Sequence, residues 1–176
     1  ASHQTVEDLS LMRSIPNMTV LSPADCTEAI KMMTAMSEIK GPVYMRLCGT
    51  TAIPMIYNED YDFEIGKAVV LQKGKELAIV ATGITMVSEA QKAAKMLEEE
   101  LGLIPTIVNM HTIKPIDKEC INDLAKTHKL IVSVEEHNII GGLGSAISEV
   151  LVSHNVNCNQ LIIGINDYNC KMGSRT

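Results

Sequence analysis

From residue 67 onward, short apolar runs alternate with amphipathic stretches, and this alternation constrains the fold more than any other feature of the sequence. The runs that are rich in aliphatic and β-branched residues, and are therefore predicted strands, are residues 67–72, 77–82, 106–110, 130–134 and 161–165. The stretches with helical spacing of apolar residues are residues 87–97, 118–127 and 145–153. Apolar strands that alternate with helices are typical of a mostly parallel sheet covered on both faces. The pattern therefore predicts an α/β fold.

The first 48 residues contain a shorter series of the same elements. Their pattern predicts one helix, at residues 5–14, and two strands, at residues 18–21 and 43–47. Ser22 and Pro23 carry the signature of a second helix start, with Ser22 as the N-cap and Pro23 at the first helical position. We expect that helix to turn Ala29, Met32, Met33 and Met36 toward the core. The α/β prediction thus extends to the whole chain.

Residues 49–66 differ from the parts on either side. Proline, glycine, asparagine and acidic residues interrupt any apolar periodicity there. We therefore predict a linker at residues 49–66, which separates a first part at residues 1–48 from a second part at residues 67–176.

Composition and charge argue against several classes of partner. The 15 Lys and Arg residues are scattered among 21 Asp and Glu residues, and the net charge of −6 argues against nucleic acid as the main partner. No apolar run approaches the length needed to span a bilayer, so we expect no membrane association. Five cysteines, odd in number and widely spaced, fit reduced thiols in a cytoplasmic protein better than a disulfide framework or a zinc site.

A glycine-rich segment, HNIIGGLGS at residues 137–145, follows a predicted strand and precedes a predicted helix. The dinucleotide-binding fingerprint requires a third glycine where this chain has Ile147, which disfavours a nicotinamide cofactor and favours a structural turn. Glu135, Glu136 and His137, at the end of the preceding strand, have two open interpretations. They are binding groups at the carboxyl end of a parallel strand, or they belong to a solvated strand end or a domain contact.

From the residues alone, the best candidate for a binding site is the pair His3 and Arg46. His3 precedes a predicted helix and Arg46 ends a predicted strand in the same part of the chain, so both side chains could face one cleft. A His and an Arg suit a phosphorylated or polyhydroxylated substrate, because both donate hydrogen bonds to oxygen. The sequence contains no GxSxG elbow, P-loop or HExxH motif, so the residues alone name no catalytic group.

Several stretches, in an unchanged order along the chain, resemble the transketolase family. They are SHQTVEDLSLMRSIPNMTVLSPAD (residues 2–25), GPVYMRL (41–47), ELAIVATGITMVSEA (76–90), VNMHTIKPID (108–117) and VEEHNIIGGLGSAISEVL (134–151). The resemblance is greatest to the C-terminal subunit of the bacterial form that is split into two subunits. It implies the C-terminal part of a pyrimidine-binding domain at residues 1–48. It also implies a three-layer α/β/α C-terminal domain with a mostly parallel sheet at residues 67–176.

This resemblance implies an activity and two substrate-binding residues. Transketolases transfer a two-carbon ketol unit from a ketose phosphate to an aldose phosphate with thiamine diphosphate and Mg²⁺, and the cofactor supplies the difficult chemistry. His3 matches a family histidine that lines the substrate channel, and Arg46 matches the first arginine of a strand-end motif. The family's second arginine, which grips the substrate phosphate, stands where this chain has Gly49. Its loss is expected to cost about 2 kcal/mol of substrate binding.

The resemblance also implies what the chain needs from elsewhere. In the family, the glutamate that activates the cofactor and the aromatic residue that stacks on it precede the position of His3, and another domain holds the diphosphate and the metal. We therefore expect no catalytic residue in this chain, and neither thiamine diphosphate nor Mg²⁺ bound by it alone. The implied partners are the N-terminal, diphosphate-binding subunit or domain, further copies of the chain in a homo-oligomer, and sugar phosphates. The alternative is a non-catalytic interaction or regulatory module derived from the C-terminal domain, which an unrelated coding sequence upstream would favour.

Overall fold

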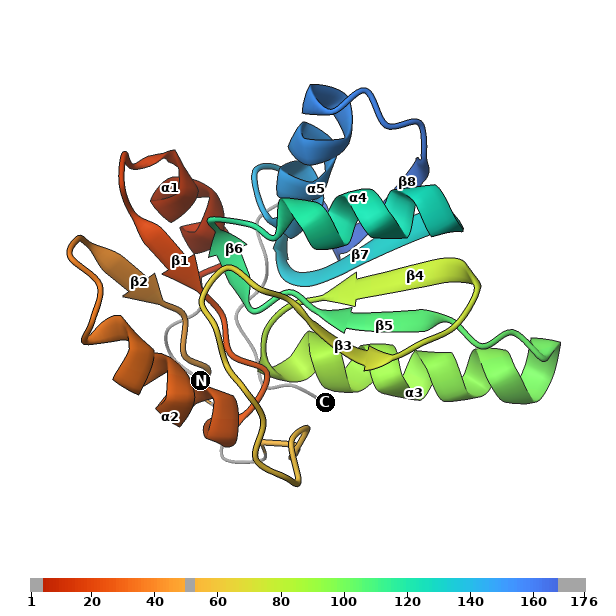
Figure 1. Cartoon of the computed structure of the whole chain (residues 1–176), viewed down its shortest axis with the longest axis horizontal. Helices are drawn as coiled ribbons and strands as arrows, with labels where there is room; N and C mark the ends of the chain where they lie inside the picture. The colour runs from red at the N-terminus through yellow and green to blue at the C-terminus, as the bar shows by residue number, and fades with distance from the viewer. Residues whose placement is uncertain (1–4, 50–52, 168–176) are drawn as a thin grey trace.

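The computed structural model describes residues 5–49 and 53–167 of the chain. Within these residues, five helices and eight strands form two α/β units that lie side by side (Figure 1). The smaller unit consists of residues 5–49 together with residues 112–114. The larger unit consists of residues 67–111 and 115–167.

The larger unit is built on a five-stranded sheet with the strand order β3-β5-β4-β7-β8. Its strands are β3 (Val69–Gln72), β4 (Glu76–Ala81), β5 (Thr106–Asn109), β7 (His128–Asn138) and β8 (Asn159–Ile165). β4 pairs in parallel with β5 and β7, and β7 pairs in parallel with β8, whereas β3 is antiparallel to β5. The sheet is therefore mostly parallel, which confirms the prediction from the alternating pattern.

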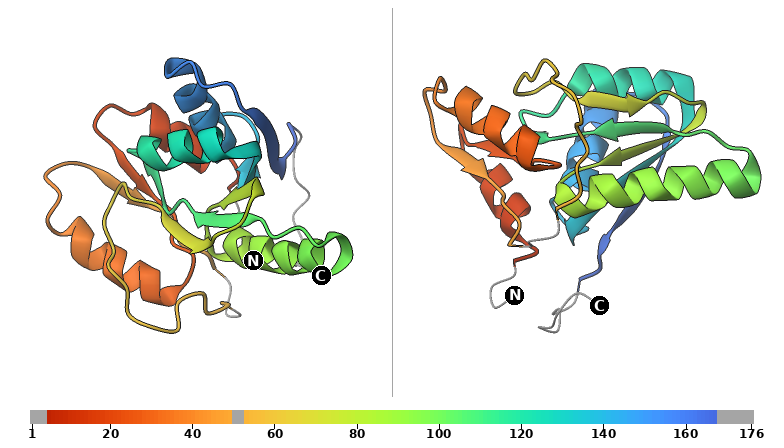
Figure 2. Two further views of the ribbon diagram at one scale, coloured as in Figure 1. Left: turned by 45° about the vertical axis from the view of Figure 1, so that its right-hand side comes forward. Right: turned by 90° about the horizontal axis from the view of Figure 1, so that it is seen from below.

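Helices cover both faces of this sheet, as Figures 1 and 2 show. The covering helices are α3 (Ile84–Leu101) on one face, and α4 (Lys118–Thr127) and α5 (Leu143–Ser153) on the other. Side chains of β4 alternate between the two cores, with Ala78 and Val80 on the side of α4 and α5, and Ile79 and Ala81 on the side of α3. The three-layer α/β/α arrangement is thus confirmed. In the described part of the chain, every helix is too short or too polar to traverse a bilayer.

The smaller unit has a three-stranded sheet in which one strand comes from the second half of the chain. Its strands, in spatial order, are β2 (Val43–Met45), β1 (Thr19–Leu21) and β6 (Thr112–Lys114). β1 is parallel to β2 and antiparallel to β6. The flanking helices are α1 (Asp8–Ser14) and α2 (Cys26–Met36). The sequence pattern does not predict β6, because this strand is only 3 residues long and its partner lies far away in the sequence.

The two units share one apolar core. Leu9 of α1 and Val20 of β1 are fully buried in the same cluster as Ile131 of β7 and Ile147 of α5. We call the contact between the units the seam. It is formed by α1, β1 and the residues after β2 on one side, and by α5 and the carboxyl ends of β5 and β7 on the other. Because its centre is apolar and buried, the seam is part of the protein core.

The start of α2 differs from the prediction. The helix begins at Cys26, and its N-cap is Asp25, whose side chain accepts a hydrogen bond from the backbone N–H of Glu28 (2.8 Å). The backbone N–H of Ser22 instead donates to the carbonyl oxygen of His111 (2.8 Å). Residue 22 therefore continues the pairing across the seam, and the helix can begin only after it.

The face that α2 buries also differs in part from the prediction. Met32 is fully buried, as predicted, but Met33 is 61% exposed. Glu28, one turn before Met32, is the other residue that α2 buries. The prediction for Met33 was therefore wrong, because α2 turns a carboxylate inward beside Met32.

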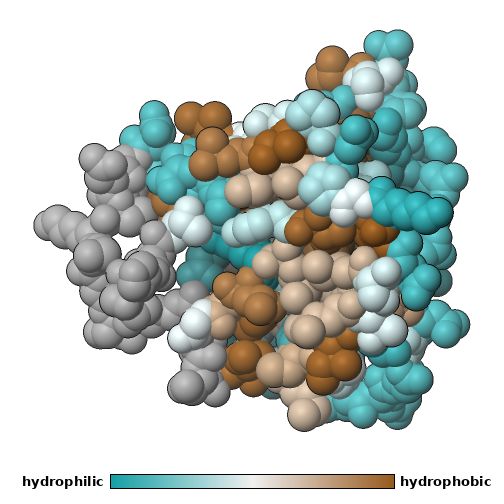
Figure 3. All heavy atoms as spheres, turned by 90° about the vertical axis from the view of Figure 1, so that its left-hand side faces the viewer, coloured by the Kyte–Doolittle hydropathy of each residue, from teal (hydrophilic) through white to brown (hydrophobic). Residues whose placement is uncertain are grey.

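The outer side of the smaller unit is apolar, as the space-filling view of Figure 3 shows. Large apolar side chains that are 38% to 66% exposed lie on α1, on α2 and after β2: Leu11, Ile15, Ile30, Met33 and Leu47. β2 is the edge strand between the two helices, and within the described residues it pairs only with β1.

The glycine-rich segment forms the turn between β7 and α5. The carboxylate of Glu135 accepts hydrogen bonds from the backbone N–H groups of Leu143 (2.6 Å) and Gly144 (2.9 Å), at the N-terminus of α5. A Cβ atom at Gly142 would overlap the carboxylate of Glu135 and the ring of His137. The glycine is therefore required by close packing, and the helix N-terminus is occupied by the protein's own carboxylate.

His111, between β5 and β6, is fully buried. Its ring packs against that of Phe63, with the ring centroids 4.7 Å apart, and its Nδ1 lies 2.9 Å from Oγ1 of Thr112. Burial lowers the pKa of His111 to about 4. The ring is therefore neutral at neutral pH, and protonating it would place a charge in the core.

This lowered pKa makes the free energy of unfolding depend on pH. An unfolded histidine binds its proton near pH 6.5, whereas the folded ring binds it near pH 4, so the stability is complete above pH 6.5 and is lost as the pH falls toward 4. Between pH 7.5 and pH 5, we expect the wild type to lose about 2 kcal/mol more than His111→Gln in urea unfolding. His154→Gln, at an exposed position, is the control and should keep the wild-type dependence. Parallel pH profiles for the wild type and His111→Gln would contradict the expectation.

Candidate functional site

Arg46 follows β2, and its guanidinium group crosses the seam. Nη1 donates to the carbonyl oxygen of Glu136 at the end of β7 (2.8 Å), and Nη2 donates to the carbonyl oxygen of Thr5 (2.9 Å). Nε lies 3.2 Å from the carboxylate of Asp8 at the start of α1, and the Arg46 side chain is 19% exposed. Arg46 therefore ties together the N-terminal segment, α1 and β7.

Asp8 is the carboxylate that orients Arg46. The same oxygen, Oδ2, accepts a hydrogen bond from the hydroxyl group of Tyr44 on β2 (2.8 Å). Burial, together with this hydrogen bond to Asp8, raises the pKa of Tyr44 to about 12. The phenol is therefore protonated at neutral pH and remains a donor to Asp8. Asp8 thus links α1 to β2 and holds the Arg46 side chain in one orientation.

The second predicted site residue, His3, lies outside the described residues. Thr5, whose carbonyl oxygen Arg46 binds, follows it by two positions. The structure thus connects Arg46 to the N-terminal segment, while the meeting of the two side chains in one cleft stays a prediction. Gly49, at the position of the expected second arginine, has open space on the side where a Cβ atom would lie.

A second polar junction lies at the end of β7. His137 is fully buried, and its Nε2 accepts a hydrogen bond from the backbone N–H of Ser10 on α1 (3.3 Å). Its Nδ1 lies 2.7 Å from the carbonyl oxygen of Asn138, which assigns the proton to Nδ1. Burial raises the pKa of the neighbouring Glu135, and the N–H groups at the start of α5 oppose that shift. The contact with α1 favours the domain-contact interpretation of these residues.

Sequence reasoning missed a third junction, around Glu28 of α2. Its carboxylate is fully buried and accepts hydrogen bonds from Asn109 of β5 (2.9 Å) and from the hydroxyl groups of Tyr57 (3.2 Å) and Tyr61 (2.8 Å). A glutamate in a helix is ordinarily solvent-exposed. The one available signal was its position, one turn before the buried Met32 on the same helical face.

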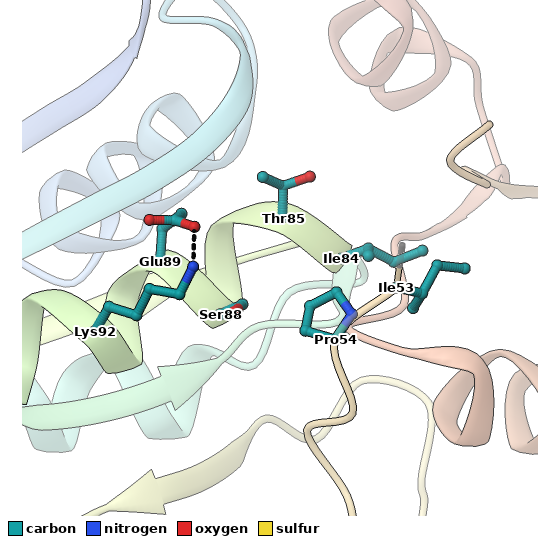
Figure 4. Close-up of a pocket in the computed structure, with 7 residues that line it drawn as sticks. All are labelled: Ile53, Pro54, Ile84, Thr85, Ser88, Glu89 and Lys92. Carbon is teal, nitrogen blue, oxygen red and sulfur yellow. Dashed lines mark hydrogen bonds and ion pairs between the residues drawn. The ribbon is translucent and has the colours of Figure 1, made fainter. Parts of the chain in front are cut away.

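A hollow of about 400 Å³ lies beside the start of α3 (Figure 4). Ile53 and Pro54 form one wall, and the first turns of α3 form the other. Lys92 on that wall is paired with Glu89 (2.7 Å), so its charge is compensated. Arg46 is not among the lining residues. Among the described residues, no three His, Cys, Asp or Glu side chains are placed to hold a metal ion together.

Comparison with known proteins matches both parts of the chain. The family model described as transketolase, C-terminal domain, matches residues 66–176, and the one described as transketolase, pyrimidine binding domain, matches residues 1–50. A transketolase C-terminal section of Methanocaldococcus jannaschii is 46% identical over 168 residues, which cover 95% of this chain and 52% of the relative. An apulose-4-phosphate transketolase subunit of Phocaeicola vulgatus is 37% identical over 175 residues, covering 99% of this chain and 54% of the relative. The chain thus spans about half the length of these relatives.

Solved structures agree with this result. A structure described as "Split gene transketolase, inactive beta4 tetramer" matches with a TM-score of 0.87 at 44% sequence identity, covering 94% of this chain and 54% of that one. The transketolase of Campylobacter jejuni, at 20% identity and a TM-score of 0.63, shares the fold. The matched domains, the similar relatives and the two α/β units joined at the seam agree: the chain belongs to the transketolase family and carries its C-terminal domain after a short portion of its pyrimidine-binding domain.

Proposed function

We propose that this chain is the C-terminal section of a transketolase that transfers a two-carbon ketol unit from a ketose phosphate to an aldose phosphate. The observation that carries the proposal is the match of two transketolase domain families, in order, on a chain that spans about half the length of its relatives. The names of those relatives, which are transketolase sections and subunits, support the same reaction class.

The apolar outer side of the smaller unit supports a polypeptide partner at that face (Figure 3). Leu11 on α1 and Ile30 on α2 are exposed, and within the described residues β2 pairs along one edge only. An open strand edge between two apolar helix flanks is the pattern of a layered unit that continues beyond its last strand. We therefore infer that further pyrimidine-domain polypeptide extends the sheet past β2, and that an N-terminal, diphosphate-binding subunit completes the enzyme.

Thiamine diphosphate with Mg²⁺ is the cofactor that we infer for the assembled enzyme. When bound, it supplies the electron sink that allows a carbon–carbon bond of the ketose to break. The described residues do not fit this group: they offer no metal cluster, and the buried carboxylates of Glu28 and Glu135 are occupied by internal donors. The chain alone is therefore proposed to bind neither the cofactor nor the metal.

We assign substrate binding on this side of the enzyme to His3 and Arg46. Among the described residues, the contacts of Arg46 with Asp8, Glu136 and Thr5 use three of the five N–H donors of a guanidinium group, and we assign the other two to substrate oxygens. The contact with Thr5 also fixes the backbone close to His3. With Gly49 at the position of the second arginine, binding of the substrate phosphate is expected to be weaker than in the family pattern.

We propose further that the chain associates with copies of itself and that it works in the cytoplasm. The solved relative at 44% identity is described as a beta4 tetramer, which supports self-association. The cysteines of the described residues are free thiols, which is typical of a reducing compartment.

Adding the parts that the longer relatives contain, and that this sequence does not span, tests the proposed activity. We expect ketol transfer between sugar phosphates when the front half of the Methanocaldococcus jannaschii relative is fused ahead of Ala1 and the matching N-terminal subunit is added. The chain alone should give neither turnover nor saturable binding of thiamine diphosphate with magnesium in titration calorimetry. Saturable binding by the chain alone would contradict the proposal, as would an inactive assembly whose parts purify together.

The same assay tests the role of Arg46. Arg46→Lys is expected to lower kcat/KM about 10- to 100-fold, because one ammonium group cannot serve three protein acceptors and a substrate oxygen together. Arg13→Lys is the matched control, since Arg13 also crosses the seam, to the carbonyl oxygen of Gly141 (2.6 Å) and to Glu149 (2.6 Å), from the last turn of α1. It should leave kcat/KM within about twofold. Equal losses of kcat/KM in the two variants would mean that Arg46 stabilises the contact between the units and does not bind substrate.

A further inference from the structure

We propose that two buried carboxylates, Asp25 at the N-cap of α2 and Glu28 on α2, hold residues 53–63 as a rigid strap, which fixes the smaller unit onto the larger one. The sequence predicts a linker there, and the strap has no helix or strand of its own. Connections of that kind are ordinarily mobile and solvated. Here the contacts of the described residues fix the strap along its length. The inference does not depend on the proposed enzymatic activity.

Asp25, the N-cap of α2, holds the backbone of the strap. Its Oδ1 accepts from the N–H of Glu28, as an N-cap requires. Its Oδ2 accepts from the backbone N–H groups of Ile56 and Tyr57, both at 2.9 Å. Asp25 is 2% exposed, so losing these bonds would leave a buried carboxylate oxygen without a donor. The same side chain thus starts a helix and anchors the strap.

Glu28 holds the side chains of the strap and connects them to the larger unit. Its Oε1 accepts from the hydroxyl groups of Tyr57 (3.2 Å) and Tyr61 (2.8 Å), and Nδ2 of Asn109 lies 2.9 Å from both carboxylate oxygens. Nδ2 of Asn109 also lies 2.8 Å from the Tyr57 hydroxyl oxygen. The backbone N–H of Ala24 donates to Oε2 (2.6 Å). One carboxylate therefore joins α2, the strap and the carboxyl end of β5.

Contacts of aromatic rings also hold the strap in place. The rings of Tyr57 and Tyr61 are stacked, with centroids 4.0 Å apart. Nζ of Lys31 on α2 lies 5.1 Å from the ring centroid of Tyr61 and forms an ion pair with Asp60 (2.5 Å). Phe63, at the end of the strap, packs on His111 of the larger unit. Tyr57 of the strap thus contacts both units, through Glu28 and Asn109, and Phe63 contacts the larger unit.

The two units are joined by polar contacts at two separate strand ends of the larger sheet. Arg46 and His137 connect the two units at the end of β7, whereas Glu28 connects them at the end of β5. The two sets of contacts hold the smaller unit at two separate strand ends, and the strap adds the hydroxyl groups of Tyr57 and Tyr61 as donors to Glu28 at the second one.

Amide hydrogen exchange on the full chain tests the strap. Tyr57→Phe/Tyr61→Phe removes two hydroxyl donors from Glu28 and keeps both stacked rings. We expect amide exchange in residues 53–63 and in the first turn of α2 to become at least about tenfold faster, with exchange in β7 unchanged. Tyr44→Phe is the matched control, because it removes a tyrosine donor from a buried carboxylate, Asp8, inside the smaller unit. It should leave exchange in the strap at the wild-type rate.

Three results would overturn the proposal. The first is strap exchange in the wild type as fast as in an unstructured peptide. The second is no change in the double variant. The third is an equal acceleration in β7, because this would mean lost global stability and not local release. Should the double variant fail to fold, Tyr61→Phe alone applies the same test with one donor removed.

Discussion

Leu9 and Val20, near the start of the chain, are fully buried in one apolar cluster with Ile131 and Ile147 of the larger unit. A unit of two short helices and three short strands buries only a small fraction of its surface. Units of that size are only marginally stable when alone. The larger unit supplies apolar partners for these residues, and the second half of the chain supplies β6, the third strand of the smaller sheet. The smaller unit therefore depends on the seam for its stability and for its position.

Buried polar groups give the seam its specific geometry. A charged group inside a core requires partners, because leaving it unpaired costs far more than an exposed pair contributes. Arg46 meets the carbonyl oxygen of Glu136, His137 meets α1, and Glu28 meets Asn109, so each group is satisfied only in one arrangement of the two units. In the proposed enzyme this arrangement holds Arg46 in place beside the substrate, and fixed positioning of that kind lowers the barrier to group transfer.

The parts of the fold that could be predicted from the sequence are those where local pattern and packing agree. α4 begins at Lys118 and ends at Thr127, as its apolar spacing predicts. β6 could not be predicted in the same way, because its partner β1 lies far away in the sequence. The cap of α2 at Asp25 could not be predicted either, because Ser22 bonds to His111 across the seam. The candidate site around Arg46 could likewise be predicted only in part, because its contacts come from segments far apart in the sequence. The strand-end motif indicates Arg46, but its spacing cannot reveal that three protein oxygens surround the guanidinium group, or that Glu28 lies inside.

If the two units share one core, they unfold together. Urea unfolding of the chain can be followed by NMR at the amide groups of Val20 in β1 and of Val132 in β7, one in each unit. A shared core predicts that the two signals disappear along coincident curves with one midpoint. Loss of the Val20 signal at a lower urea concentration than that of Val132 would mean that the smaller unit unfolds separately, and would contradict a fold that depends on the seam.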